Sequence, residues 1–165
     1  MFCLEGMLKT FTCLFLVACV AAGCGGDDPS SPSPVGEFPG MVGTWDGTLT
    51  VSGAVGGSPV SNTCRETWTI SSQSAANFVG TFQTSGGTPN PCSQSGSLNG
   101  TVAAGGGVTD VVHGSLINPN TCTRVSRTPM AGAVNGAALS AQSNETLSCS
   151  GTTVTRTLSV SLTKR

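Results

Sequence analysis

From about residue 41 to the end of the chain, apolar and polar side chains alternate with a period of two, and glycine-rich stretches interrupt the alternation. This pattern is typical of short antiparallel β-strands, in which successive side chains point to opposite faces of a sheet. No helix of usable length is expected, because the alanine-rich segment 131–139 contains two glycines and Asn135. We predict eight strands, at residues 43–53, 60–73, 77–86, 92–104, 108–118, 122–134, 139–149 and 153–164.

The strand number and spacing predict an all-β domain, either an antiparallel up-and-down barrel of about eight strands or a two-sheet β-sandwich. Two Asn-Gly pairs occur in the domain. Such a pair is ordinarily a hairpin turn, and we expect a turn at Asn135–Gly136. We expect Asn99–Gly100 to remain within a strand, because its surroundings repeat the shape of neighbouring strands.

The alternation also assigns faces. Large apolar residues two positions apart share one side of a strand and identify the interior. The predicted inward set is Trp45, Leu49, Val51, Cys64, Trp68, Ile70, Phe78, Phe82, Leu98, Val102, Leu139, Ala141, Leu147, Cys149, Val154, Leu158, Val160 and Leu162. This core is lean, since the chain has two Trp and no Tyr.

The same count places four charged side chains on the inward face: Glu66, Arg124, Glu145 and Arg156. A lone buried charge is costly, so such groups pair with each other or face a wet cavity. The interpretation we favour is structural ion pairing, or strand ends that reach solvent. The alternative is a polar pocket in the mouth of a barrel. That pocket would be lined by Trp45, Glu66, Trp68, Arg124, Glu145 and Arg156.

Four cysteines lie in the domain, and an even number in an exported chain indicates disulfides rather than free thiols. They are Cys64, Cys92, Cys122 and Cys149. Three pairings are open; we favour Cys64–Cys92 with Cys122–Cys149, because each joins neighbouring segments. A metal site is the disfavoured alternative, since no two of these cysteines are close in sequence and the chain has one histidine. We expect no metal and no cofactor.

Charge and motifs exclude several function classes. The net charge of −1 and seven Lys and Arg residues leave no basic stripe for nucleic acid. A hydrolytic triad needs a base, but His113 is the only histidine and the alternation leaves its face undecided. Glu66 and Glu145 are the only carboxylate pair that suggests glycoside chemistry. We therefore expect a monomeric domain that is not an enzyme.

The N-terminal region predicts export. Residues 11–22 form an apolar run of twelve residues, shorter than the roughly 20 that span a bilayer, and Lys9 precedes it. This order matches a secretory signal peptide. The segment "VAAGC", ending at Cys24, resembles the lipobox of bacterial lipoproteins, and "LVAC", ending at Cys19, is a weaker rival.

The lipoprotein resemblance implies that Cys24 is lipidated and becomes the new N-terminus. Gly25 after it implies the outer membrane. The following tract of Gly, Asp, Ser and Pro predicts a disordered tether. We therefore divide the chain into a signal peptide (1–23), a lipid-anchored flexible linker (24–40) and an all-β domain (41–165), in the bacterial cell envelope.

A second resemblance concerns the domain itself. "VGTWDG", with Gly43 and Trp45, is similar to the opening strand of lipocalin-type barrels. It also resembles the opening strand of avidin-type barrels. In the lipocalin superfamily an arginine of the last strand packs across this tryptophan, which implies that Arg156 stacks on Trp45. The aromatic cage of avidins is absent. The resemblance therefore supports a fold and names no ligand.

Three function hypotheses follow. The first is a non-catalytic binding or interaction module, held at the membrane by its lipid, for a small ligand or an envelope protein. The second is an inhibitor of an exogenous protease or lysozyme, acting through an exposed loop formed by Thr88, Pro89, Asn90 and Pro91. The third, an enzyme using Glu66 and Glu145, is the one we least favour.

Overall fold

The computed structural model describes residues 36–55, 57–113 and 122–165. Within them the chain forms nine β-strands and no helix. The strands are β1 (Gly43–Val55), β2 (Ser58–Ser74), β3 (Asn77–Thr88), β4 (Gln94–Val102), β5 (Gly107–Val112), β6 (Cys122–Arg127), β7 (Met130–Asn135), β8 (Ala138–Cys149) and β9 (Thr152–Lys164).

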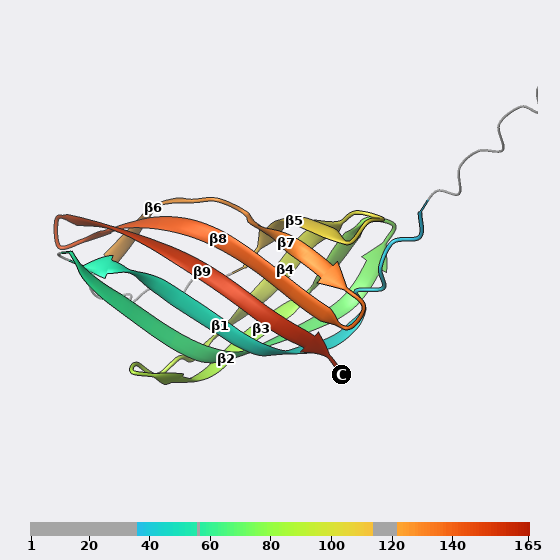
Figure 1. The fold of residues 1–165 in the computed structure, drawn as a ribbon, viewed down its shortest axis with the longest axis horizontal. Helices are drawn as coiled ribbons and strands as arrows, with labels where there is room; N and C mark the ends of the chain where they lie inside the picture. The colour runs from blue at the N-terminus through green and yellow to red at the C-terminus, as the bar shows by residue number, and fades with distance from the viewer. Residues whose placement is uncertain (1–35, 56, 114–121) are drawn as a thin grey trace, which may run out of the picture. The chain divides into compact units, whose positions relative to one another are not determined.

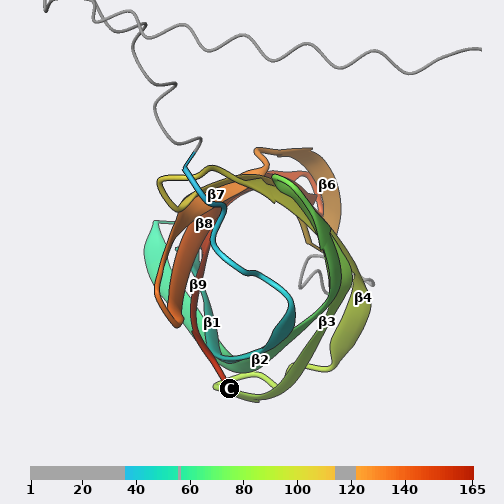
Figure 2. The same ribbon diagram turned by 90° about the vertical axis from the view of Figure 1, so that its right-hand side faces the viewer.

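Eight of these strands form a closed antiparallel barrel. The order around it is β8-β7-β5-β4-β3-β2-β1-β9, and the pairing of β9 with β8 completes the ring (Figure 2). The strands follow each other around the ring as they do along the chain. The predicted up-and-down barrel is therefore confirmed over the sandwich.

The ninth strand arises where one strand was predicted at 122–134. Both β6 and β7 pair with β8, β6 with its C-terminal half and β7 with its N-terminal half. Pro129 lies between them and has no N–H to donate to the ladder, so the strand is interrupted there. The predicted end of the strand at 108–118 lies partly outside the described residues.

The predicted faces agree with the core. Trp45, Leu49 and Trp68 are completely buried, as is Leu158 on β9. The alternation of burial along β8 is strict from Leu139 to Leu147. Asn99–Gly100 lies within β4, and Gly136 lies in the turn between β7 and β8 with a φ of 57°. The sequence pattern therefore identified most of the interior correctly. Val51 and Cys149 are half-buried, and the predicted inward position of Arg124 is wrong, because Arg124 is exposed on β6, which lies outside the closed ring.

One end of the barrel is closed by the segment that leads into β1. Met41 is completely buried in the core, and its carbonyl accepts a hydrogen bond of 2.7 Å from Trp45 Nε1. Its N–H donates to Gln73 Oε1, and Gln73 Nε2 donates to the Pro39 carbonyl. Figure 2 shows this segment crossing the ring. The hydrogen bonds of Gln73 hold the segment in place.

Candidate functional site: a cavity at the disulfide end of the barrel

The opposite end of the barrel holds a cavity of about 770 Å³. It lies among the β1–β2 hairpin, the β3–β4 connection and the β8–β9 hairpin, all of which end on the left in Figure 1. Apolar side chains provide much of its lining. The lining residues are Val51, Ser52, Gly53, Val60, Ser61, Asn62, Asn90, Pro91, Cys92, Ser93, Gln94, Cys122, Leu147, Cys149, Val154 and Arg156.

Both disulfides lie at this end. Cys64 is bonded to Cys92, and Cys122 to Cys149, as predicted. The first joins β2 to the β3–β4 connection, and the second joins paired positions of β6 and β8. They therefore tie together strands that form the wall of the cavity.

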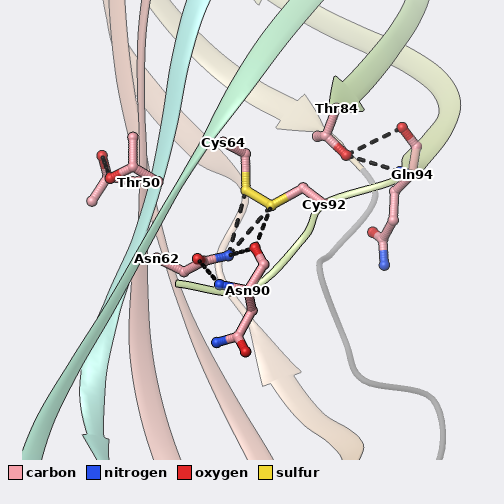
Figure 3. The surroundings of a disulfide bond; sticks show 8 residues. Thr50, Asn62, Cys64, Thr84, Asn90, Cys92 and Gln94 are labelled. Atoms are coloured by element: carbon pink, nitrogen blue, oxygen red, sulfur yellow. Dashed lines mark hydrogen bonds between the residues drawn. A yellow bond between two sulfur atoms is a disulfide. The ribbon is translucent and has the colours of Figure 1, made fainter. Parts of the chain in front are cut away.

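The connection after β3 is held against the cavity by Asn62 of β2 (Figure 3). Asn62 Nδ2 donates to the Asn90 carbonyl at 3.1 Å, and the Asn90 N–H donates to Asn62 Oδ1 at 3.0 Å. Gly87 has a φ of 116°, and a Cβ there would lie 2.2 Å from the Asn90 carbonyl oxygen. Only glycine fits this close approach. The predicted interaction loop is thus exposed, yet restrained.

A polar layer lies next to the cavity in the barrel, and Glu145 is at its centre. The register places Glu145 of β8 opposite Arg156 of β9 on one side and Arg127 of β6 on the other. Its Oε1 accepts a hydrogen bond of 2.6 Å from Arg124 Nε, and its Oε2 accepts one of 2.7 Å from Arg156 Nε. The Glu145 side chain is 0% exposed, compared with 38% for Arg124 and 13% for Arg156.

Arg127 extends this layer. Its Nε donates to Ser143 Oγ at 3.2 Å, and its side chain also donates to the His113 carbonyl. Burial lowers the pKa of Arg127, and the neighbouring charges of Arg124 and Arg156 lower it further, against the opposing effect of Glu145. Burial and the two neighbouring arginines therefore both disfavour the charged form of Arg127.

A second buried carboxylate, Glu66, lies in the same barrel interior. Its Oε1 accepts a hydrogen bond of 2.7 Å from Trp68 Nε1 and lies 2.7 Å from His113 Nε2. The side chains of Glu66 and His113 are both 0% exposed. The His113 ring lies 4.1 Å from that of Phe82, centroid to centroid. This group is a packed cluster of buried side chains joined by short polar contacts.

The inward position of His113 was not found by sequence reasoning. The strand β5 contains a register irregularity between Val108 and Val111, and Asp110 has a φ of 55°. This irregularity changes the parity, so Val108, Val111 and His113 are all buried. Aspartate tolerates the left-handed conformation better than most residues. The Thr-Asp pair at 109–110 was therefore the one available signal.

The six residues proposed for a polar pocket do not line one cavity. Arg156 alone of them lines the cavity at the disulfide end. Arg124 lines a separate cleft of about 180 Å³ beside His113 and Arg127. Glu66 and Glu145 are buried beneath, and Trp45 and Trp68 are completely buried in the core. The ion pairing that the sequence favoured for the charges is observed for Glu145 with Arg124 and Arg156.

The prediction that Arg156 stacks on Trp45 is wrong. Trp45 pairs with Lys164 across β1 and β9, whereas Arg156 pairs with Gly53, near the other end of β1. Lys164 Nζ lies 5.5 Å from the centroid of the Trp45 ring and donates to the Gly40 carbonyl. A lysine near the C-terminus therefore makes the cation–π contact that the resemblance assigned to Arg156.

The comparisons with known proteins identify no relative. No protein-family model, no curated protein and no solved structure matches this chain. In the described ranges, no helix is long and apolar enough to cross a membrane, and no three His, Cys, Asp or Glu side chains are grouped to hold a metal ion. Cys19 and Cys24 lie outside the described residues.

Proposed function

We propose that this protein is a lipid-anchored binding module of the bacterial cell envelope, which holds a small and largely apolar ligand at the disulfide end of its barrel. The cavity of about 770 Å³ is the observation that carries the proposal. Ligand sites in proteins are concave, mostly apolar and roughly 300–1,000 Å³ in volume, with a few polar groups that fix orientation. Barrel mouths are among the places where they occur.

The walls of the cavity support a preformed site. Two disulfides and the paired hydrogen bonds of Asn62 with Asn90 restrain the segments around it. A restrained site loses less conformational entropy when a ligand binds, which favours affinity. Leu147 and Val154 are buried in the barrel interior and still line the cavity, so the apolar surface they offer is part of the fold.

The arrangement of the carboxylates favours binding over catalysis. Glu66 and Glu145 have fully buried side chains. Glu145 uses both oxygens to pair with arginines, and Glu66 accepts from Trp68. A glycosidase needs an acid and a base that both reach the scissile bond. These two groups are instead committed to their neighbours inside the barrel.

The exposed segment Thr88–Pro91 keeps the inhibitor of an exogenous hydrolase as a second candidate. Its favourable feature is rigidity, since the Cys64–Cys92 disulfide and Asn62 both restrain it. Asn90 and Pro91 also line the cavity, however. A loop that forms a cavity wall is less free to enter the active site of a target enzyme. Ligand binding is therefore the function we place first.

A tryptophan at position 154 is expected to weaken binding. N-phenylnaphthylamine, a neutral apolar probe, should fluoresce when mixed with the wild-type protein. In Val154→Trp the larger side chain occupies part of the cavity, and affinity should fall by about tenfold or more, the equivalent of roughly 1.4 kcal/mol. Fluorescence titration measures the affinity of the wild type and of the variant for the probe.

Thr155→Trp is the matched control, because Thr155 is exposed on the outer face of the same strand. It should bind the probe like the wild type. Absence of probe binding by the wild-type protein, or equal binding by Val154→Trp in its folded state, would contradict the proposed function.

The membrane anchor is tested separately with Cys24→Ala. We expect this variant to lose incorporation of labelled fatty acid and to move from the membrane fraction to the soluble fraction of bacterial cells. The expected loss is complete, because the thiol of Cys24 is the proposed site of attachment. Retained labelling that disappears in Cys19→Ala would transfer the anchor to Cys19, and retained labelling in both would refute the lipoprotein assignment.

A further inference from the structure

The lining of the cavity at the disulfide end is almost free of charge. Among the described residues that line it there is no Asp, Glu or Lys, and Arg156 is the only charged side chain. Its Nε donates to Glu145 Oε2, its Nη2 is buried, and the side chain is 13% exposed. The internal residues outside the described ranges, Gly56 and 114–121, include no charged residue in the sequence. A charged group in the cavity would therefore lose water and meet no opposite charge other than the paired Arg156.

The other hydrogen-bonding side chains of the lining are uncharged. They lie on β1, on β2, in the β3–β4 connection and at the start of β4. These residues are Ser52, Ser61, Asn62, Asn90, Ser93 and Gln94. Besides Arg156, the strands β6, β8 and β9 contribute Cys122, Leu147, Cys149 and Val154. The lining therefore offers a ligand an apolar wall and, on other strands, neutral hydrogen-bonding groups.

Gln94 is the member of this set that has an unused hydrogen-bonding group on the inward face. It is half-buried and shares the parity of the buried Leu98 and Val102 on β4. Its backbone N–H and carbonyl are bonded to Thr84 Oγ1, at 2.9 and 3.3 Å. Its side-chain amide points away from Thr84 in Figure 3 and has no hydrogen-bond partner among the described residues. The amide of Asn62, by contrast, is occupied by Asn90.

From these observations we infer that the ligand is an uncharged amphiphile, with an aliphatic part and a neutral group such as a hydroxyl or an amide. The aliphatic part packs on Leu147 and Val154, and the neutral group bonds the amide of Gln94. A glutamine amide both donates and accepts, as a hydroxyl does, whereas a carboxylate only accepts and an ammonium group only donates. This inference rests on the proposed function, since it names the class of ligand for the same cavity.

The test compares decanediol, decanedioate and decanediamine, which share one aliphatic chain and carry neutral, negative or positive groups at its two ends. A molecule that enters the cavity end-on must bring one of these groups with it, so the charge cannot simply stay in solvent. Each compound is titrated at neutral pH against the N-phenylnaphthylamine complex of the wild-type protein. We expect decanediol to bind about tenfold or more tightly than either charged compound, because a charged end loses its hydration without gaining a partner.

Gln94→Met should lower the affinity for decanediol by about fivefold, the range of one hydrogen bond between neutral groups. The bonds to Thr84 use the backbone of Gln94, so the substitution leaves them in place. Gln83→Met is the matched control, because Gln83 is exposed on the outer face of β3, and it should bind decanediol like the wild type. Retained binding of N-phenylnaphthylamine shows that each variant is folded. The wild-type comparison of the three compounds stands by itself if Gln94→Met fails to fold.

The outcomes separate this inference from the proposed function. Binding of decanedioate or decanediamine to the wild type as tightly as decanediol would overturn the inference while the cavity function stands. An unchanged affinity of folded Gln94→Met for decanediol would overturn it as well. Absence of binding by every compound, N-phenylnaphthylamine included, would refute the proposed function itself.

Discussion

Replacing Cys64 and Cys92 together by serine is expected to lower the free energy of unfolding by about 3–4 kcal/mol. The two cysteines are 28 residues apart, so the bond removes considerable loop-closure entropy from the unfolded chain. Removal of this disulfide should also weaken probe binding in the cavity, because the bond holds Cys92 and the segment before it against β2. Asn62 Nδ2 lies 3.3 Å from Cys92 Sγ, so its hydrogen-bonded position depends on the same bond (Figure 3). Urea unfolding measures the stability, and N-phenylnaphthylamine titration measures the cavity.

The matched control is the double replacement of Cys122 and Cys149. Its sequence separation of 27 is nearly the same, so the loss of stability should be similar. The connection after β3 keeps its own disulfide in this variant, and exchange of the Asn90 amide should stay slow. Fast exchange of that amide is expected only when Cys64 and Cys92 are replaced. An unchanged unfolding midpoint in both variants would show that the bonds contribute nothing to the stability of the barrel.

Glu145→Gln is expected to destabilise the protein by about 3 kcal/mol, the lower end of what breaking a buried ion pair costs. The substitution leaves Arg156, which is 13% exposed, and the more accessible Arg124 without their shared carboxylate. The partial exposure of Arg124 is the reason for choosing the lower value. Thermal and urea unfolding of the variant and the wild type measure the difference.

Glu37→Gln serves as the control, because Glu37 is exposed and its substitution changes the net charge by the same amount. It should leave the midpoint of unfolding unchanged. Adding Arg156→Met to Glu145→Gln should recover part of the loss, since the second change removes a charge that the first left unpaired. Stability losses that simply add in this double variant would argue that Glu145 and Arg156 do not form a coupled pair.

The barrel could be predicted because the alternation of buried and exposed residues that specifies its strands is local in the sequence. Along β8, buried and exposed residues alternate from Leu139 to Leu147, and this period of two is visible in the sequence itself. The same alternation placed Glu66 and Glu145 inside, where the structure has them. The disulfide pairing was also predicted, because each bond joins segments that are close in the chain. The prediction from alternation failed at β5, where an irregularity around Asp110 reverses the parity and buries His113.

The candidate site depended on information that alternation does not contain. Parity shows that Arg156 and Trp45 share an interior, but their distance along the barrel depends on the register between β1 and β9. That register sets Arg156 beside Gly53 and Lys164 beside Trp45. Two residues on the same inward face can therefore belong to different levels of the barrel, one in the packed core and the other at the cavity.

The sequence by itself thus determined the all-β class of the fold, most of the inward residues and the presence of buried charges, and it favoured the observed cysteine pairing, since each depends on neighbours close in the chain or on composition. Only the tertiary structure decided that Glu145 pairs with Arg124 and Arg156, that Met41 helps to close one end, and that a cavity lies at the other. The physical reason is that strand register and closure of the ring are set by the packing of all the strands together, and no single stretch of the chain encodes them.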